Sequence, residues 1–441
     1  MKSFKIVILL CLFTNVTQVN AAEWDIIHAG TLLAVPGEAA TTKQSVILKD
    51  CKIFDVQDGF INSASLPIND DDSIHIHDLR DEFVLPGFID GHVHLTLYFT
   101  PQERINWVNM SDADIAVRGA KFAKDTLMAG FTSVRDMGSF TEDAVFAIRD
   151  GINQGFIIGP RTFVSGHLIT INGGHGDITH SFNPAVSNAL RTSGICDGVA
   201  ECRKAVREQI RRKADHVKLT ATAGVLSDSA AGLEQQFFDD ELQAIVDTAH
   251  LMGRKVAAHA HGAEGINAAL RAGVNTIKHG TFLNDESIRL FKSTGAYLSP
   301  TISAYLPFVK AIDDPNSFLT QAQREKAKRA MDVMNTFVRK AHKAGVNIAL
   351  STDAGVGPHG ANGIEFRLLV ENGGMTPMEA IKAGTINGAD NIGKLDELGS
   401  LEAGKWGDIV AVNGNPLDDI TILQNVSFVM KEGVVYKHIT N

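Results

Sequence analysis

The stretch of sequence that decides the fold is Leu85-Pro86-Gly87-Phe88-Ile89-Asp90-Gly91-His92-Val93-His94. Its apolar residues predict a buried strand that ends in two histidines with one residue between them. Side chains at positions i and i+2 of a strand point to the same face, so His92 and His94 can bind one metal ion together. Further strands ending in ligand side chains would extend this pair into a metal centre.

Seven more apolar runs resemble strands, and amphipathic helical patterns lie between most of them. The strand candidates are residues 84–94, 132–136, 161–166, 216–220, 255–261, 276–280, 297–300 and 347–353. The helical candidates include residues 112–128, 201–212, 239–252 and 321–343. Eight alternating strand and helix units predict an α/β fold of the (β/α)8 barrel type rather than an open, doubly wound sheet. We assign residues 85–395 to this barrel.

The two ends of the chain are β-rich and lack this alternation. Residues 22–84 contain short strand-like runs, and residues 396–441 return to the same pattern. We predict that the two ends pair into one small β-sandwich domain. His75-Ile76-His77 in the first of these regions repeats the spacing of His92 and His94, but no further ligands follow it at strand intervals. We therefore interpret that pair as a solvated strand face.

The first 21 residues have the pattern of a secretory signal peptide. Lys2 and Lys5 precede the apolar residues 6–13, and Val19-Asn20-Ala21 provides a cleavage pattern with small residues. A bilayer needs about 20 apolar residues, so this run is too short to be a membrane anchor. The sequence predicts an exported protein, periplasmic or secreted.

The composition is that of an acidic globular protein, with 44% hydrophobic residues, 21% charged residues and a formal net charge of −10. Acidic proteins of this kind are not expected to bind nucleic acids or anionic membranes. We expect the partner to be a small-molecule substrate.

Four cysteines occur, and Cys11 would leave with the signal peptide. Cys196 and Cys202 are six residues apart, in a chain predicted to reach a compartment where disulfides persist. A local disulfide and a pair of buried thiols are both compatible with this spacing. Cys51 would remain a free thiol.

Metal-ligating side chains lie at the ends of several predicted strands, where a (β/α)8 barrel gathers its chemistry. They are His92 and His94 on the first strand, Lys218 on the fourth, His259 and His261 on the fifth, His279 on the sixth and Asp353 on the eighth. A single strand histidine is more often a hydrogen-bonded core residue than a ligand. Their joint occurrence predicts a metal centre, because imidazole nitrogens and carboxylate oxygens suit zinc and related ions.

These motifs resemble those of the amidohydrolase superfamily. The first strand end, Gly130-Phe131-Thr132-Ser133-Val134-Arg135-Asp136-Met137-Gly138 and Gly404-Lys405-Trp406-Gly407-Asp408-Ile409-Val410 carry the resemblance, which runs from about residue 24 to the end. The chain is most similar to the branch of imidazolonepropionase-like proteins, metal-dependent prolidases and other dipeptidases, and ochratoxin-hydrolysing amidases. The motifs shared with that branch are Gly173-Gly174-His175-Gly176-Asp177, Val217-Lys218-Leu219, Ala258-His259-Ala260-His261-Gly262, Ile277-Lys278-His279-Gly280 and Ser351-Thr352-Asp353-Ala354.

The resemblance implies a role for each of these residues. His92, His94 and Asp353 would bind a first divalent ion, and His259 and His279 would bind a second, with zinc as the expected metal. Lys218, carboxylated by carbon dioxide, would bridge the two ions. His259 is preferred to His261 on the motif match alone. From their positions after or at the end of the third, fifth and eighth strands, we expect His175 to stabilise the oxyanion and His261 and His359 to contact the substrate. Lys278 stands where the branch often has Glu, and we expect it to point outward or to lie behind the ligands.

The resemblance also implies a reaction. A hydroxide bridging the two ions would cleave an amide bond, and Asp353 would move its proton to the leaving amine. The expected substrate is a dipeptide, with Xaa-Pro as one candidate, or an N-acyl amino acid. A lactonase, a phosphotriester hydrolase or a cyclic-amide hydrolase is the alternative with the same ligands.

Two other functions agree less well with these residues. Lys218 argues against a mononuclear deaminase or imidazolone hydrolase, and the complete ligand set argues against a non-catalytic metal- or ligand-binding protein. Many members of the branch assemble, which makes a homo-oligomer compatible with the resemblance.

Overall fold

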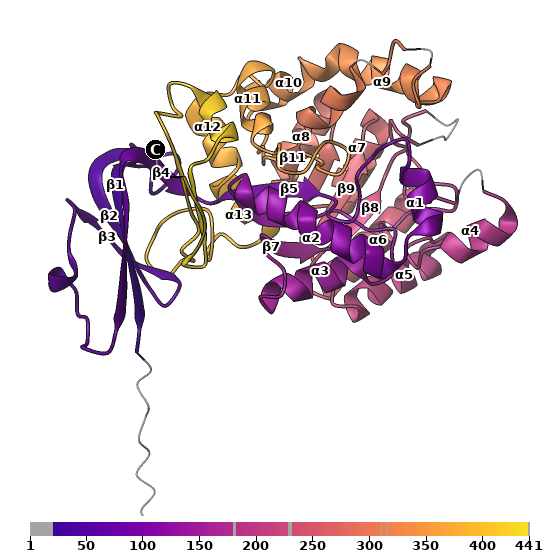
Figure 1. The fold of residues 1–441 in the computed structure, drawn as a ribbon. Coiled ribbons are helices and arrows are strands. Elements are labelled where there is room, and N and C mark those ends of the chain that lie inside the picture. The colour runs from indigo at the N-terminus through magenta and orange to yellow at the C-terminus, as the bar shows by residue number, and fades with distance from the viewer. Residues whose placement is uncertain (1–20, 180–181, 228–231, 310, 315, 440–441) are drawn as a thin grey trace, which may run out of the picture.

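The computed structural model describes residues 21–179, 182–227, 232–309, 311–314 and 316–439 (Figure 1). The predicted signal peptide falls on residues 1–20 almost entirely and so lies outside the described residues.

Seven short parallel strands form the centre of the molecule. A three-stranded sheet contains β5(Phe88–Val93), β6(Phe131–Asp136) and β7(Arg161–Val164), and a four-stranded sheet contains β8(Val217–Thr220), β9(Val256–Ala260), β10(Thr276–His279) and β11(Tyr297–Ser299). Single β-bridges link the two sheets in sequence order: Ile169 with Leu219, Leu298 with Ile348, and Val93 with Ala354. Neighbouring strands therefore follow one another around a ring, although no continuous ladder closes it.

The eighth predicted strand, residues 347–353, is extended chain held by individual hydrogen bonds. The amide of Leu298 donates to Asn347 O over 2.8 Å, and the amide of Gly91 donates to Leu350 O over 3.0 Å. Asp353 then adopts a left-handed conformation with φ of 60°, which ends the extended segment. The segment occupies the predicted place between β11 and β5 without forming a regular ladder.

Helices lie on the outside of the strands (Figure 1). They are α1(Glu103–Asn109), α2(Asp112–Met128), α3(Ala144–Asn153), α4(Pro184–Leu190), α5(Val199–Arg211), α6(Asp239–Leu251), α7(Ala263–Ala272), α8(Asp285–Thr294), α9(Gln321–Met334), α10(Phe337–Lys343), α11(Ile364–Glu371), α12(Pro377–Ala383) and α13(Ile386–Ile392). Three short 3-10 helices are η1(Ser63–Ser65), η2(Ile302–Phe308) and η3(Ile420–Gln424). The helix predicted at 321–343 is two helices, because Asn335 and Thr336, residues of low helix propensity, cap α9 and α10.

Both ends of the chain enter one seven-stranded sheet with the order β14-β13-β12-β4-β1-β2-β3. Its strands are β1(Glu23–Leu32), β2(Thr41–Lys49), β3(Lys52–Asp58), β4(Ser73–Pro86), β12(Ile409–Val412), β13(Phe428–Lys431) and β14(Val434–His438). The 14-residue β4 pairs with β1 along most of its length and with β12 at its last residues. The predicted sandwich is thus one continuous sheet, and Val46 and Leu48 share a core with Ile409 and Met430 from its other half.

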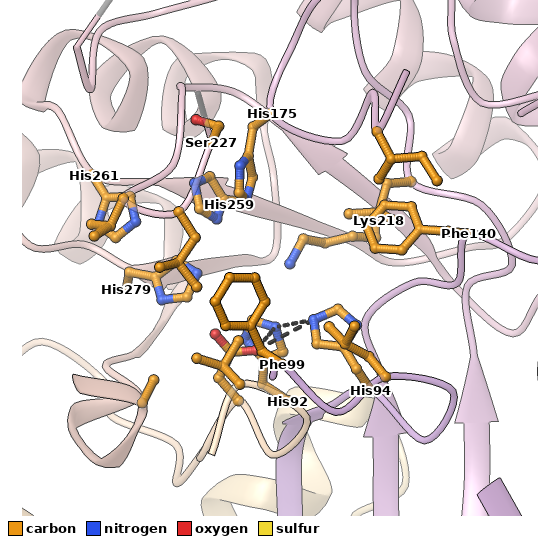
Figure 2. Close-up of a pocket in the computed structure, with 18 of the residues that line it drawn as sticks. His92, His94, Phe99, Phe140, His175, Lys218, Ser227, His259, His261 and His279 are labelled. Carbon is orange, nitrogen blue, oxygen red and sulfur yellow. Dashed lines mark hydrogen bonds and ion pairs between the residues drawn. The ribbon is translucent and has the colours of Figure 1, made fainter. Parts of the chain in front are cut away.

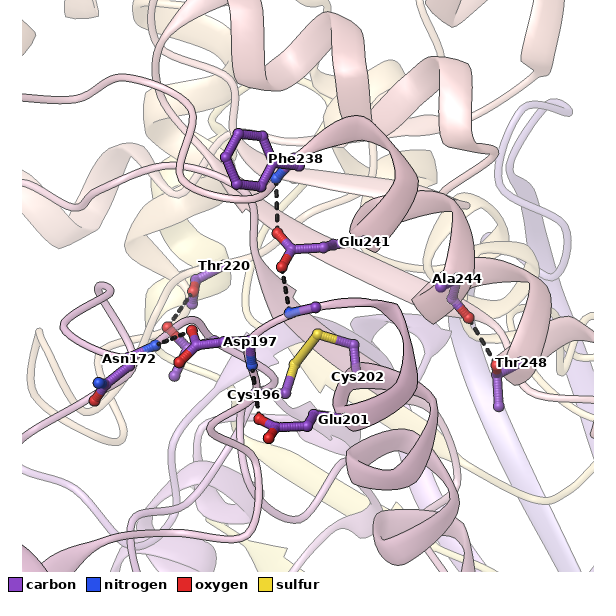
Figure 3. The surroundings of a disulfide bond; sticks show 12 residues. Asn172, Cys196, Asp197, Glu201, Cys202, Thr220, Phe238, Glu241, Ala244 and Thr248 are labelled. Atoms are coloured by element: carbon purple, nitrogen blue, oxygen red, sulfur yellow. Dashed lines mark hydrogen bonds between the residues drawn. A yellow bond between two sulfur atoms is a disulfide. The ribbon is translucent and has the colours of Figure 1, made fainter.

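Cys196 and Cys202 form a disulfide just before and within α5 (Figure 3). Glu241 of α6 accepts hydrogen bonds from the amides of Gly198 and Phe238 and so ties this loop to the neighbouring helix. Cys51 is a half-buried free thiol.

The second His-x-His pair, His75 and His77, lies on one face of strand β4. His77 Nε2 lies 2.7 Å from Asp25 Oδ1, and His75 is exposed near Glu23. Neither joins a cluster of three ligands in the part of the chain that the structure describes. Among the described helices, none has the length and apolar character needed to cross a membrane.

Candidate metal centre

The strand ends bring the predicted ligands to one cavity (Figure 2). His92 lies in β5 and His94 one residue beyond it, Lys218 in β8, His259 in β9 and His279 at the end of β10, with Asp353 after the extended segment. All six side chains are buried and line a cavity of about 150 Å³. The prediction that these residues lie together therefore agrees with their placement.

His92, His94 and Asp353 form the first group of ligand atoms. Asp353 Oδ1 lies 3.2 Å from His92 Nε2 and 3.3 Å from His94 Nε2. His94 Nδ1 lies 2.8 Å from the carbonyl oxygen of Gly138 and must donate to it, which leaves the lone pair of a neutral His94 on Nε2. That lone pair faces an anionic oxygen that, among the described residues, has no hydrogen-bond partner of good geometry. A cation between these acceptors removes their repulsion, so the group fits a divalent metal.

A proton competes with the metal at this place. Burial alone would lower the pKa of His94, but the close contact with the charged Asp353 carboxylate outweighs burial and raises it. Metal binding must displace that proton.

His259, His261 and His279 form the second group, with ligand atoms all within 4.8 Å of one another. His279 Nδ1 lies 2.7 Å from Thr301 Oγ1, and that hydroxyl donates to Pro300 O over 2.7 Å. Thr301 therefore accepts from His279 Nδ1–H, which leaves the Nε2 lone pair for a metal. Ligand atoms of His92, His279 and Asp353 also lie within 4.8 Å of one another, so the two groups adjoin.

Lys218 points into the space between the two groups (Figure 2). Its side chain is 2% exposed and forms no hydrogen bond or ion pair with any residue described by the structure. Burial lowers the pKa of Lys218 to about 7. A buried cation without an anionic partner is costly, whereas a lysine carbamate would present two oxygens to two cations. This position fits carboxylation.

The histidines are held in the neutral form that binds metals. Burial, and then the charges of neighbouring groups such as Lys218 and the other histidines, lower the pKa values of His92, His259 and His279 well below the ordinary range.

Two of the candidate metal ligands have unusual backbone conformations. His279 and Asp353 have φ of 69° and 60°, and Thr301 behind His279 has φ of 53°. Non-glycine residues in this region cost about 1–3 kcal/mol each and persist where the surroundings hold them. Strain of this kind marks sites where function fixes the geometry.

Two buried carboxylates hold these strained segments. Asp90 accepts hydrogen bonds from Thr352 Oγ1 at 2.5 Å and from Asn362 Nδ2 at 2.8 Å, next to Asp353. Glu365 accepts from the amides of Ile302 and Ser303, both at 2.8 Å, directly after Thr301. Burial raises the pKa of Asp90 to about 6 and that of Glu365 to about 7.

His175 lies over the second group. Its ring stacks on His259 with centroids 4.1 Å apart, and its Nδ1 is buried without a hydrogen-bond partner among the described residues. A Cβ added to Gly224 would lie 2.2 Å from His175 Cε1, so this glycine makes room for the ring. One N–H of the neutral His175 imidazole is thus available to a substrate.

The rest of the cavity wall is mostly apolar. Its side chains include Leu97, Phe99, Trp107, Phe140, Leu168, Ile178, Val225, Leu226, Tyr305, Phe308 and Val356. Ser227 and Tyr305 add hydroxyl groups, and the Tyr305 hydroxyl lies 3.2 Å from Thr281 Oγ1. His261 also lines the cavity, and its Nδ1 lies 2.8 Å from Thr281 Oγ1.

Two residues considered in the sequence analysis, His359 and Lys278, do not belong to the cavity wall. His359 does not line the cavity: its ring stacks on Phe122, and its Nε2 lies 3.0 Å from Leu97 O. Lys278 points inward rather than outward and is fully buried behind the ligands, where its Nζ donates to Gly91 O over 2.8 Å and to Ser299 Oγ over 3.1 Å.

Comparison with known proteins identifies the family of the chain. A family model described as the amidohydrolase family matches residues 83–439. The chain belongs to the amidohydrolase family. This amidohydrolase is 32% identical to ochratoxinase of Aspergillus niger, over 96% of this chain and 88% of the relative. The crystal structure of a Xaa-Pro dipeptidase with bound methionine aligns with a TM-score of 0.86 and 36% identity, over 94% of this chain and all of that chain. Imidazolonepropionase of Cutibacterium acnes is 31% identical over a shorter part, 35% of this chain and 34% of the relative. The protein is therefore an enzyme of the hydrolase class.

Several residues of the site were not found from the sequence. Asp90 belongs to the same motif as His92 and His94, and its position two residues before His92 could have indicated a supporting role at the site. Thr301 follows the end of the seventh strand, where barrel residues act, but nothing local marks it. Tyr305 and Glu365 reach the site only through tertiary contacts.

Proposed function

We propose that this amidohydrolase cleaves the amide bond of a dipeptide or an N-acyl amino acid at a centre of two divalent ions, with zinc as the expected metal. The observation that carries the proposal is the pair of adjoining ligand groups with the buried Lys218 between them. His92, His94 and Asp353 would hold one ion and His259 and His279 the other, and a carboxylated Lys218 would offer its oxygens to both. When bound, the ions supply an activated water and polarise the scissile carbonyl.

Asp353 moves the proton in this reaction. Its Oδ1 is buried beside the ligand nitrogens and has no hydrogen-bond partner of good geometry among the described residues. This oxygen accepts the proton of the attacking water and passes it to the leaving nitrogen. The N–H of His175, which reaches the cavity above His259, donates to the oxygen that becomes negative.

The cavity and the relatives support the substrate class. The apolar walls suit an apolar side chain or acyl group and exclude water from the scissile bond. The similarity to a Xaa-Pro dipeptidase and to ochratoxinase makes Xaa-Pro dipeptides and N-acyl amino acids the substrates to test first. His261, beside the second group, is placed to contact them.

We also propose that the ring of strands is a (β/α)8 barrel and that the enzyme works outside the cytoplasm. The sequential bridges from β5 around to residues 347–354 support the barrel. The Cys196–Cys202 disulfide supports an oxidising compartment.

The test is amine release from a library of dipeptides and N-acyl amino acids, with protein produced in the presence of zinc and bicarbonate. Stereospecific cleavage of a coherent subset is the expected result. Asp353→Asn should abolish turnover, and the control His250→Ala, on the outer helix α6, should not. Cleavage of lactones or phosphotriesters but of no amide, by protein with two metals bound, would overturn the proposed substrate class.

A further inference from the structure

A second layer of buried polar side chains lies on the amino-terminal side of the metal ligands, inside the ring of strands. We call it the inner polar layer. Thr276 begins β10 and His216 directly precedes β8, so these two members lie at the strand ends opposite the cavity. Its members are Arg135, His216, Thr276, Lys278, Ser351 and Asn391.

Two basic side chains of this layer have no ionic partner among the described residues. Arg135 is 1% exposed and Lys278 is 0% exposed, and neither forms an ion pair with any carboxylate in the described ranges. Burial lowers the pKa of Arg135 to about 9, which still leaves the guanidinium protonated at neutral pH. Its Nη1 lies 3.5 Å from Thr276 Oγ1, and its Nη2 has no hydrogen-bond partner among the residues described. A buried, unpaired charge is strongly unfavourable.

Further hydrogen-bonding groups of the layer are also unused. Ser351 Oγ and Asn391 Nδ2 are buried without partners in the described structure. Thr276 Oγ1 donates to Asn391 Oδ1 over 2.5 Å, which leaves the Asn391 amide N–H groups free. The same threonine contacts Arg135, so these three side chains adjoin.

Ser351, Asn391 and Lys278 meet around Gly91. A Cβ at Gly91 would lie 2.7 Å from Ser351 Oγ and 3.2 Å from Asn391 Nδ2. The Gly91 carbonyl oxygen accepts from Lys278 Nζ. Asn391 therefore connects this group to Thr276 and Arg135, and the unused groups adjoin one another.

The nearby carboxylates, Asp90 and Asp136, form their hydrogen bonds with residues other than Arg135 and Lys278. Asp90 accepts hydrogen bonds from Thr352 and Asn362, and Asp136 accepts from the amides of Leu95 and Gly138. The inner polar layer is therefore rich in N–H and O–H donors, and no carboxylate in the described ranges forms an ion pair with Arg135 or Lys278.

We propose that the inner polar layer binds one small monovalent inorganic anion, of the halide class, against Arg135. N–H and O–H donors together with a guanidinium form the lining that such an anion requires, and a metal cation would be repelled there. The anion supplies the contact that Arg135 lacks and fixes the strand ends beneath the metal ligands. This site is separate from the substrate cavity and does not depend on the proposed substrate.

The test uses bromide as the probe. Crystals of the metal-loaded protein grown in sodium bromide should show an anomalous peak at the bromine edge within hydrogen-bond distance of Arg135 Nη2. The thermal unfolding midpoint should rise saturably with sodium chloride or bromide, compared with sodium gluconate at equal ionic strength.

Two matched variants make the stability result specific. Arg135→Met should abolish the halide dependence, whereas Arg149→Met, at a buried arginine that is paired with Asp150 and Asp215, should keep it. Water density without an anomalous peak, or equal midpoints in chloride and gluconate, would overturn the proposal. If Arg135→Met does not fold, the anomalous map of the unmodified protein decides alone.

Discussion

Thr301 Oγ1 lies 2.7 Å from Nδ1 of His279, and this contact sets which imidazole nitrogen faces the metal centre. The threonine is held in turn by its left-handed backbone and by Glu365, which binds the two following amides. A residue outside the ligand set thus fixes the tautomer of a ligand.

Replacement of Thr301 by valine should weaken metal binding at the second group. The variant keeps the side-chain shape but loses the acceptor for His279 Nδ1–H, and loss of such partners lowers metal affinity or activity about 10–100-fold. Titration with a chelator, monitored by metal content, measures the change.

Thr281→Val is the matched control, because Thr281 Oγ1 makes the corresponding contact with His261 Nδ1. If His259 and His279 are the ligands, metal affinity should change little in this variant. A larger loss for Thr281→Val than for Thr301→Val would assign His261 to the metal instead.

Lys218→Ala should lose bound metal and activity together, because it removes the side chain that we propose to be carboxylated between the two groups. A short carboxylic acid such as acetate or propionate, added at high concentration, should restore part of both by occupying the space of the lost side chain. We would measure metal stoichiometry and amide hydrolysis over an acid titration. Full metal content and activity in Lys218→Ala would rule out a bridging role.

Gly224→Ala should reduce kcat while leaving the metals in place. The added Cβ would lie 2.2–2.3 Å from atoms of the His175 ring and would displace it from the cavity. We expect a loss of about 100-fold or more, the range seen when one oxyanion donor is removed. The control is Gly357→Ala, because a Cβ added at Gly357 would have only Ser303 O within 4 Å, at 4.0 Å. Equal kcat values for the two variants would show that His175 does not act on the substrate.

The sequence predicted the parts of this centre that strand periodicity determines. His92 and His94 follow a long apolar run, and His259 and His279 lie at the ends of short β-branched or alanine-rich strands. The local sequence pattern therefore predicted that these side chains lie at the same end of the ring of strands. Parallel strands in a ring then bring such residues together.

Positions in loops could not be predicted in the same way. His359 follows the eighth segment as the motif residues do, but its loop turns the ring onto Phe122. Glu365 lies on α11, and its contact with the residues after Thr301 depends on how two distant segments pack. Lys278 was expected either outside the barrel or behind the ligands, and the second position is the one observed, because Lys278 shares the inner face of β10 with Thr276 two residues earlier. The left-handed conformation of His279 breaks the strand alternation and turns the His279 side chain toward the cavity.

Glu365 should make stability depend on pH. Its folded pKa, about 7, lies above its ordinary value, so the folded state keeps a proton that the unfolded state releases. The free energy of unfolding should therefore fall as pH rises from about 4.5 to about 7, by up to about 3 kcal/mol, and stay lower above that range. Glu365→Gln should flatten this slope in denaturant unfolding at several pH values. An unchanged slope would assign the effect to other groups.

The disulfide should stabilise the fold by a modest amount. Cys196 and Cys202 are six residues apart, and a loop of this length contributes about 2 kcal/mol in the chain-entropy model. The double variant Cys196→Ser/Cys202→Ser should unfold at a lower temperature and lose sensitivity to reductant, whereas Cys51→Ser should behave like the unmodified protein. A reductant effect that persists in the double variant would contradict this assignment.

A crystal structure of the zinc-loaded protein, with anomalous data at the zinc edge, tests the central claim most directly. We predict two zinc peaks, one among His92, His94 and Asp353 and one between His259 and His279, with continuous density extending from Lys218 Nζ to both. A single peak, or two peaks beside an unmodified Lys218, would contradict the account.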